Sequence, residues 1–138
     1  MIKKKRFMLS IFLLAAFSAY ADSFEKTPVA IVVEYTAVHR KEAELLNMLQ
    51  NHAHLTQKEE PGCLFFGVLR PVDRHGAPVP DRILLTEFYK DKDAASIHAK
   101  NPRLPEFRKK IIPLIASEKV TQTRVLTSAM EFSQAKIY

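Results

Sequence analysis

Two ionisable side chains in the second half of the chain have the chemistry needed for proton transfer. His98 lies near the end of an expected short helix, and Glu87 lies in an expected apolar strand. Histidine is the side chain whose ordinary pKa is nearest to neutral pH, and the pKa of a carboxyl group rises in an apolar cavity. We therefore predict His98 as a base and Glu87 as its orienting partner. The structural alternatives are a histidine at a helix end and a glutamate in a salt bridge.

Aromatic side chains recur around this pair and could form the wall of a pocket for a flat ligand. Tyr89 shares a strand face with Glu87, while Tyr35, Phe65 and Phe107 come from other expected elements. Aromatic rings line many ligand pockets, but they also fill ordinary cores. The sequence predicts these four residues as substrate contacts and leaves the core interpretation open.

Other kinds of site have no support in the sequence. There is no H-E-x-x-H, C-x-x-C or G-x-G-x-x-G motif, and His52 and His54 have a spacing that puts them on different helix faces. We therefore predict neither a metal site nor a nucleotide site. Cys63 is the single cysteine, so it cannot form a disulfide within the chain. It is interpreted as a small buried residue; a reactive or interchain-bridged thiol is the alternative.

The first 21 residues have the pattern of a cleaved signal peptide. A basic segment, 3–6, precedes the uncharged apolar run 7–20 and an A-x-A site, which predicts Asp22 as the mature N-terminus. The run is shorter than the ~20 residues of a membrane-spanning helix, which disfavours the alternative of an uncleaved anchor. These residues hold four basic and no acidic side chains, so the net charge of +6 falls to +2 from Asp22 onward. The sequence therefore predicts a periplasmic or secreted protein and no nucleic-acid partner.

The remaining residues, 22–138, are expected to form one domain with its core at 29–127. Apolar alternation and length predict strands and helices in the order β-α-β-β-α-β, with the last helix broken in two. Pro61 ends the first helix, and Gly62 is expected to adopt a left-handed turn. This order predicts an α+β, ferredoxin-like fold. The expected strands are 29–36, 63–69, 83–89 and 120–128, and the expected helices are 39–58, 94–99 and 104–116.

The expected sheet has more apolar surface than its helices can cover. The segments 29–33, 63–69 and 83–88 are apolar on both faces, whereas a sheet with one face in water shows alternation. The tail 128–138 is also too apolar for a purely solvated segment. We therefore predict a homodimer that covers the second face. The loop 70–82 is either a rim segment or a tolerated insertion.

Several of these segments, taken in order, resemble those of a known family. The order of a long helix, Glu60-Pro61-Gly62-Cys63, Thr86-Glu87-Phe88-Tyr89, a helix with His98, and Asn101-Pro102 resembles the antibiotic biosynthesis monooxygenase domain, over about residues 29–127. The small quinol monooxygenase-like members look most similar. The resemblance implies a dimeric α+β barrel with a pocket between sheet and helices.

The resemblance also implies a range of reactions. Several members oxidise quinols or phenolic polyketides with dioxygen and no cofactor, while others degrade haem or isomerise a phosphorylated sugar. This chain has Tyr89 where many members have tryptophan, and Arg103 where many have a second histidine. The absence of tryptophan weakens the haem interpretation. We therefore expect a cofactor-independent quinol monooxygenase; the alternative is a non-catalytic, dimeric protein that binds an aromatic or haem-like ligand.

Overall fold

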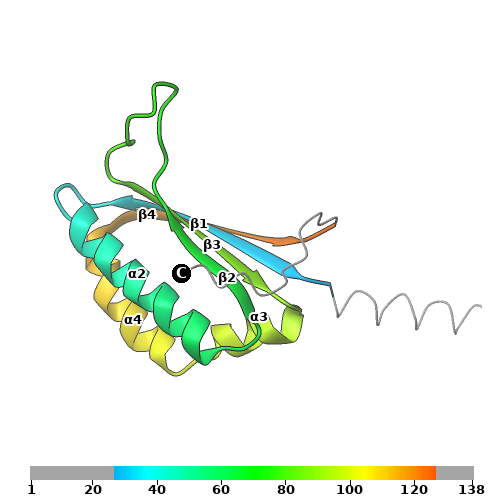
Figure 1. The fold of residues 1–138 in the computed structure, drawn as a ribbon. Helices are drawn as coiled ribbons and strands as arrows, with labels where there is room; N and C mark the ends of the chain where they lie inside the picture. Colours follow the sequence, from blue (N-terminus) through cyan, green and yellow to red (C-terminus); the bar gives the residue numbers. More distant parts are fainter. Residues whose placement is uncertain (1–26, 127–138) are drawn as a thin grey trace, which may run out of the picture.

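The protein is an antiparallel sheet with all its helices on one face, seen in a computed structural model that describes residues 27–126 (Figure 1). The elements follow the predicted order, and the strands lie in the order β2-β3-β1-β4. The α+β, ferredoxin-like class is therefore confirmed. The elements are β1 (Val29–Ala37), α2 (Glu42–Glu59), β2 (Cys63–Leu69), β3 (Arg82–Tyr89), α3 (Lys92–Ala99), α4 (Arg103–Ile111), the 3₁₀ turn η1 (Ile112–Leu114) and β4 (Ile115–Arg124).

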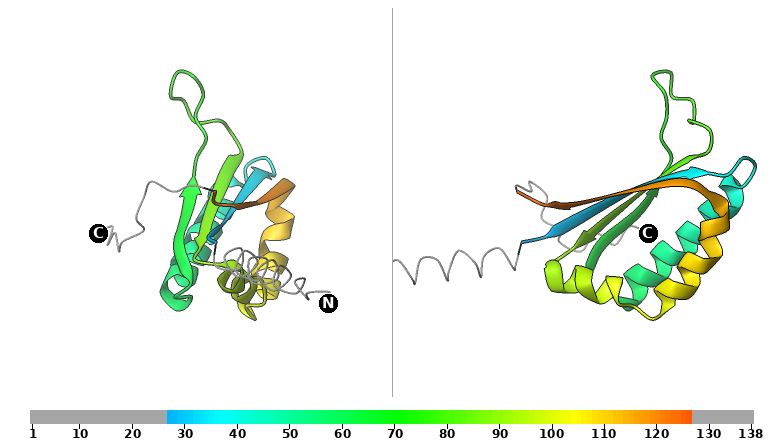
Figure 2. Two further views of the ribbon diagram at one scale, coloured as in Figure 1. Left: turned by 90° about the vertical axis from the view of Figure 1, so that its right-hand side faces the viewer. Right: turned by 180° about the vertical axis from the view of Figure 1, so that it is seen from behind.

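Strand alternation decides which side chains face the helices. Odd-numbered residues of β1 and β3 point toward α2 and α4, which run side by side beneath the sheet (Figure 2). Leu45 and Leu49 of α2 meet them in a core from which water is excluded. Burial of these apolar side chains is the main favourable term in folding.

The two largest differences between observed and expected helix boundaries have local reasons. Helix α2 begins at Glu42 rather than residue 39, because Arg40 has a φ of 65°, which a right-handed helix does not allow. Pro113 ends α4 early, at Ile111, since proline has no N–H for the helix ladder. Asp91 is the cap of α3, where its carboxylate accepts a hydrogen bond from the Ala94 N–H at 2.8 Å.

The last strand was expected to start at Val120, and this was wrong. It begins at Ile115 and pairs with β1 from Ala37 to Val29. The residues that precede Val120 are mostly polar and exposed, because β4 is an edge strand, so its start carries no apolar alternation.

Gly62 also departs from the expected conformation. Among the glycines of the described residues, Gly76 has a positive φ, whereas Gly62 does not. Gly62 is required because a Cβ at this position would lie 2.5 Å from the Cβ of Ala94. The turn that carries Glu60 is thereby packed directly against α3.

The loop between β2 and β3 projects away from the sheet (Figure 1). The carboxylate of Asp73 orders its tip by accepting hydrogen bonds from the N–H groups of His75 and Ala77. None of the helices within residues 27–126 has the length and apolar character needed to cross a membrane. The expected signal segment 1–21 and tail 128–138 lie outside the described residues.

Candidate functional site

Glu87 is a buried carboxyl group on the helix-facing side of the sheet. It is only 6% exposed, because β3 alternation places it beside Leu85 and Tyr89 over the core. The hydroxyl of Tyr89 donates a hydrogen bond to Glu87 Oε2 at 2.8 Å. Burial raises the pKa of the Glu87 carboxyl, while the Tyr89 hydrogen bond and His98 oppose that rise. The salt bridge to lysine or arginine considered from the sequence is not what the structure shows.

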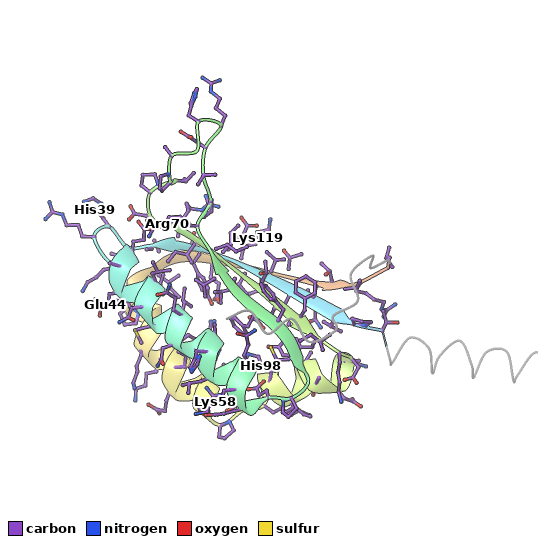
Figure 3. The ribbon with its side chains drawn as sticks, viewed as in Figure 1. His39, Glu44, Lys58, Arg70, His98 and Lys119 are labelled. Carbon is purple, nitrogen blue, oxygen red and sulfur yellow. The ribbon has the colours of Figure 1, made fainter. Side chains whose placement is uncertain are left out.

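His98 lies in the last turn of α3 and points into the molecule. Figure 3 shows it between the sheet and the end of α2. Its Nδ1 lies 2.9 Å from Glu60 Oε2, and its Nε2 lies 3.9 Å from Glu87 Oε2. The ring is buried. The imidazole therefore lies between two carboxyl groups, in contact with one and close to the other.

Glu60 is a residue of this site that the sequence did not single out. It follows the last residue of α2 and is 7% exposed. Its Oε1 accepts a hydrogen bond from Asn101 Nδ2 at 2.6 Å and lies 3.6 Å from Arg103 Nη2. The E-P-G-C segment was interpreted as a structural turn only. Its glutamate, placed before a helix-ending Pro-Gly, was the one available signal.

His52 is a second buried histidine at the site. Its ring stacks on Phe107 with a centroid distance of 4.0 Å and an interplanar angle of 13°. Burial lowers the pKa of His52 to about 4, with smaller contributions from His98 and Arg103. His54, two residues later, is exposed. The two histidines therefore lie on different faces of α2, as their spacing predicts.

A cavity of about 600 Å³ lies between the sheet and the segment that contains α3 and α4. His98 and Glu87 line one part of it, and apolar side chains of β1, β3 and β4 form much of the rest. Tyr35, Arg108 and Glu118 line it as well. Arg108 binds both carboxylate oxygens of Glu118, at 2.6 and 2.9 Å. The cavity therefore combines apolar walls with two polar clusters: His98 with Glu87, and Tyr35 with Arg108 and Glu118.

A smaller hollow of about 500 Å³ lies between α2 and α4. Its polar lining includes Asn51, Arg103 and Lys110. The stacked rings of His52 and Phe107 line both this hollow and the larger cavity. Neither Glu87 nor His98 lines the smaller hollow, so we place the chemistry in the larger one.

The structure brings together four of the six predicted site residues. His98, Glu87, Tyr35 and Phe107 all line the larger cavity. Tyr89 does not line this cavity; it is fully buried and donates a hydrogen bond to Glu87.

Phe65 does not line that cavity, and its predicted role as a substrate contact is corrected. A β-bulge between Cys63 and Phe65 shifts the alternation of β2, so that Phe65 pairs with Phe88 and Phe66 pairs with Glu87. Phe66 is consequently the buried ring, and it lies 5.5 Å from the ring of His52.

Two further properties of the site concern the reactivity of the Cys63 thiol and the capacity to bind a metal ion. Burial raises the pKa of the Cys63 thiol to about 12, so the reactive thiolate is scarce at neutral pH. Its Sγ lies 3.6 Å from the carbonyl oxygen of Phe65. Within residues 27–126, no group of three or more His, Cys, Asp or Glu side chains is arranged to hold a metal ion.

Comparisons with known proteins identify the family and the fold. A family model described as antibiotic biosynthesis monooxygenase matches residues 28–110. A search of curated proteins finds no match. Solved structures show the same fold. A candidate antibiotic biosynthesis monooxygenase from Nitrosomonas europaea is 20% identical, with a TM-score of 0.64, over 75% of this chain and 94% of that one.

Two further structures are similar. A candidate antibiotic biosynthesis monooxygenase from Chloroflexus aurantiacus is 20% identical, with a TM-score of 0.58, over 74% of this chain and 96% of that one. A dimeric protein of unknown function from Bacteroides fragilis, with a ferredoxin-like fold, is 11% identical. Its TM-score is 0.57, over 71% of this chain and 96% of that one. At these identities the likeness shows the fold.

Proposed function

This chain belongs to the antibiotic biosynthesis monooxygenase family, and from that premise we propose that it is a cofactor-independent monooxygenase of a quinol or similar small aromatic. The observation that carries the proposal is His98, a buried imidazole that lines the cavity and whose Nε2 lies 3.9 Å from Oε2 of Glu87, which lines it too. A quinol becomes a good electron donor to dioxygen once it loses a proton. A base in an apolar cavity is therefore the main requirement of this reaction.

The proposed reaction is balanced by the substrate and dioxygen alone. Nε2 of His98 accepts a proton from one quinol hydroxyl, and the resulting anion transfers electrons to dioxygen. In total the ring gives up four electrons. One oxygen atom forms a new C–O bond as a ring C–H bond breaks, and the other leaves as water, so the product is a hydroxyquinone. Glu87 would orient the imidazole or a substrate hydroxyl, and Tyr35 and Phe107 would contact the ring.

The proposed compartment is the periplasm or the exterior of the cell. Its support is the basic segment, apolar run and A-x-A site within residues 1–21. Mass spectrometry of protein from the native host should find Asp22 as the first residue. An intact Met1 on the folded protein would contradict this assignment.

The proposed assembly is a homodimer formed through the face of the sheet that lacks helices. That face carries Val32 and Leu84, with Phe65 packed on Phe88 at a ring distance of 6.0 Å. Their side chains are only partly buried in the single chain. A standard interface covers on the order of 800 Å² per partner, and apolar burial of that size would stabilise the pair.

The test of the function is oxygen consumption by the purified mature protein with a panel of quinols and catechols, without added metal or flavin. We expect uptake above the autoxidation rate, loss of this uptake in His98→Asn, and retention in His54→Asn, which changes an exposed histidine of α2. Ligand-induced thermal stabilisation without any turnover would instead support the binding protein considered from the sequence.

A further inference from the structure

Glu60 is a buried carboxyl group at an electrostatically unfavourable place. It caps the C-terminal end of α2, where its N–H donates to the Thr56 carbonyl oxygen at 2.9 Å. The helix dipole puts partial negative charge at this end, so a carboxylate there is disfavoured. A buried carboxylate needs compensating partners. The nature of those partners indicates what this residue does.

Within residues 27–126, the hydrogen-bond and ion-pair partners of the Glu60 carboxylate come from one segment, at the end of α3 and the start of α4. Oε2 lies 2.9 Å from His98 Nδ1, and Oε1 accepts the Asn101 amide at 2.6 Å. Arg103 adds positive charge, with Nη2 at 3.6 Å. A separate contact, from Arg103 Nε to Glu59 Oε2 at 3.0 Å, holds the guanidinium in place. Both carboxylate oxygens are therefore fixed, and one of them faces the imidazole.

The geometry points to Glu60 as the residue that positions His98, an inference that rests on the proposed function. A carboxylate can only accept at this distance, so Nδ1 must carry the proton of the neutral ring. Nε2 is then left without a proton, 3.9 Å from the carboxyl group of Glu87, a residue that lines the cavity together with His98. Glu60 thus sets both the orientation and the tautomer that a base acting on the cavity requires.

Glu60 has a second effect during the proton transfer itself. When the substrate O–H bond breaks, its electron pair stays on the oxygen and a new N–H bond forms at Nε2. The imidazolium that results carries a positive charge beside the Glu60 carboxylate. Glu87 and Tyr89 of β3, His52 of α2 and Arg103 of α4 also face this ring or its partner. Of the carboxyl groups of Glu60 and Glu87, that of Glu60 is the one within hydrogen-bond distance of the His98 ring.

The competing explanation is that Glu60 only ties α3 and α4 to the end of α2. Its hydrogen bond with Asn101 and its ion pair with Arg103 would serve that purpose without any role for His98. Two substitutions separate these explanations. Glu60→Gln keeps an acceptor oxygen but loses the charge, whereas Glu60→Ala loses both. Glu44→Gln is the control, since it changes an exposed glutamate of α2 whose ion pair is with Lys41 and not with the Glu60 network.

The test is a long-range ¹H–¹⁵N spectrum of the His98 ring at a pH where the ring is neutral. We expect the Nδ1–H tautomer in the wild type, Glu44→Gln and Glu60→Gln, and a shift toward Nε2–H in Glu60→Ala. An Nε2–H ring in the wild type, or an unchanged tautomer in Glu60→Ala, would overturn the inference. This readout needs no turnover, so its failure is distinguishable from failure of the proposed function.

Kinetics with an active quinol provide the second readout. Glu60→Gln should lower kcat at least tenfold with little change in KM, and it should move the acidic limb of the kcat/KM profile to lower pH, because the imidazolium loses its compensating charge. A purely structural role predicts a lower melting temperature with an unchanged pH profile in the molecules that remain folded. That second pattern would also overturn the inference.

Discussion

Tyr89 donates a hydrogen bond to Glu87, which lies two residues earlier on the same face of β3, and the two side chains are among the most buried polar groups of the sheet. The same environment raises the pKa of the Tyr89 phenol, first through burial and then through the charge of Glu87. The phenol therefore remains a donor at all ordinary pH values. Glu87 keeps this one strong partner while its second neighbour, His98, lies at 3.9 Å.

Glu87→Gln should make the protein more stable at neutral pH and less active. The folded-state pKa of Glu87 is raised above 4.5, so the folded state holds the proton more tightly and stability falls as pH rises through the folded pKa. Glutamine keeps an acceptor for Tyr89 and carries no charge. We expect a melting temperature several degrees higher at pH 7, since ~1 kcal/mol corresponds to ~4–8 °C in such a domain.

The same gain should vanish well below pH 4.5, where wild-type Glu87 is protonated in both the folded and the unfolded state. Glu106→Gln, at an exposed position of α4, is the control and should change the melting temperature little at either pH. A Glu87→Gln protein that is less stable at pH 7 would show that the charged form of Glu87 is favoured in the fold.

His52→Phe should reduce the sensitivity of the fold to acid. Wild-type His52 takes up its proton near pH 6.5 when unfolded but only near pH 4 when folded, so stability is present above pH 6.5 and is lost as pH falls toward 4, by up to about 3 kcal/mol. Phenylalanine keeps the stack on Phe107. Urea unfolding at pH 7 and pH 4.5 measures the effect, and an equal loss of stability in both proteins would contradict it.

Local patterns in the sequence were sufficient to predict the faces of the strands. Val33 and Tyr35 share one strand face, and so do Leu85 and Glu87. This follows from the two-residue period of a β-strand alone, and the structure shows both pairs on the buried face. The start of β4 and the orientation of Phe65 were not predictable in this way. One depends on pairing of a polar edge strand with β1, and the other on a bulge that only the pairing with β3 reveals.

The site was predictable only in part for a related reason. His98 and Glu87 could be identified by residue type and strand face. Glu60 meets His98 across 38 residues of sequence, and no local period reports such a contact. The packing of the Gly62 turn against Ala94 brings these two segments together.

Gly62→Ala should destabilise the fold by about 1–3 kcal/mol, the usual cost of forcing a methyl group into a packed site. The new Cβ would meet the Ala94 methyl at 2.5 Å. The double variant Gly62→Ala with Ala94→Gly should recover part of this loss, because it removes the opposing methyl group. Additive losses in the double variant, measured by urea unfolding, would mean that the two positions are not in contact.

Val32→Lys should convert the proposed dimer into a monomer. Val32 lies on the central strand β1, on the face without helices, and a lysine there would lose its hydration in the interface. Light scattering at micromolar concentration should give twice the chain mass for the wild type and for Val72→Lys, a control in the exposed loop. A monomeric wild type would contradict the assembly.

The central claim is that the cavity beside His98 supports oxygen insertion into a quinol with no electron donor other than the substrate. Mass spectrometry of the product formed under ¹⁸O₂ in ordinary water tests this most directly. The account predicts one ¹⁸O atom in each hydroxyquinone, one dioxygen consumed per quinol, and no labelled product with His98→Asn. An unlabelled quinone formed with hydrogen peroxide, at a rate that His98→Asn leaves unchanged, would contradict it.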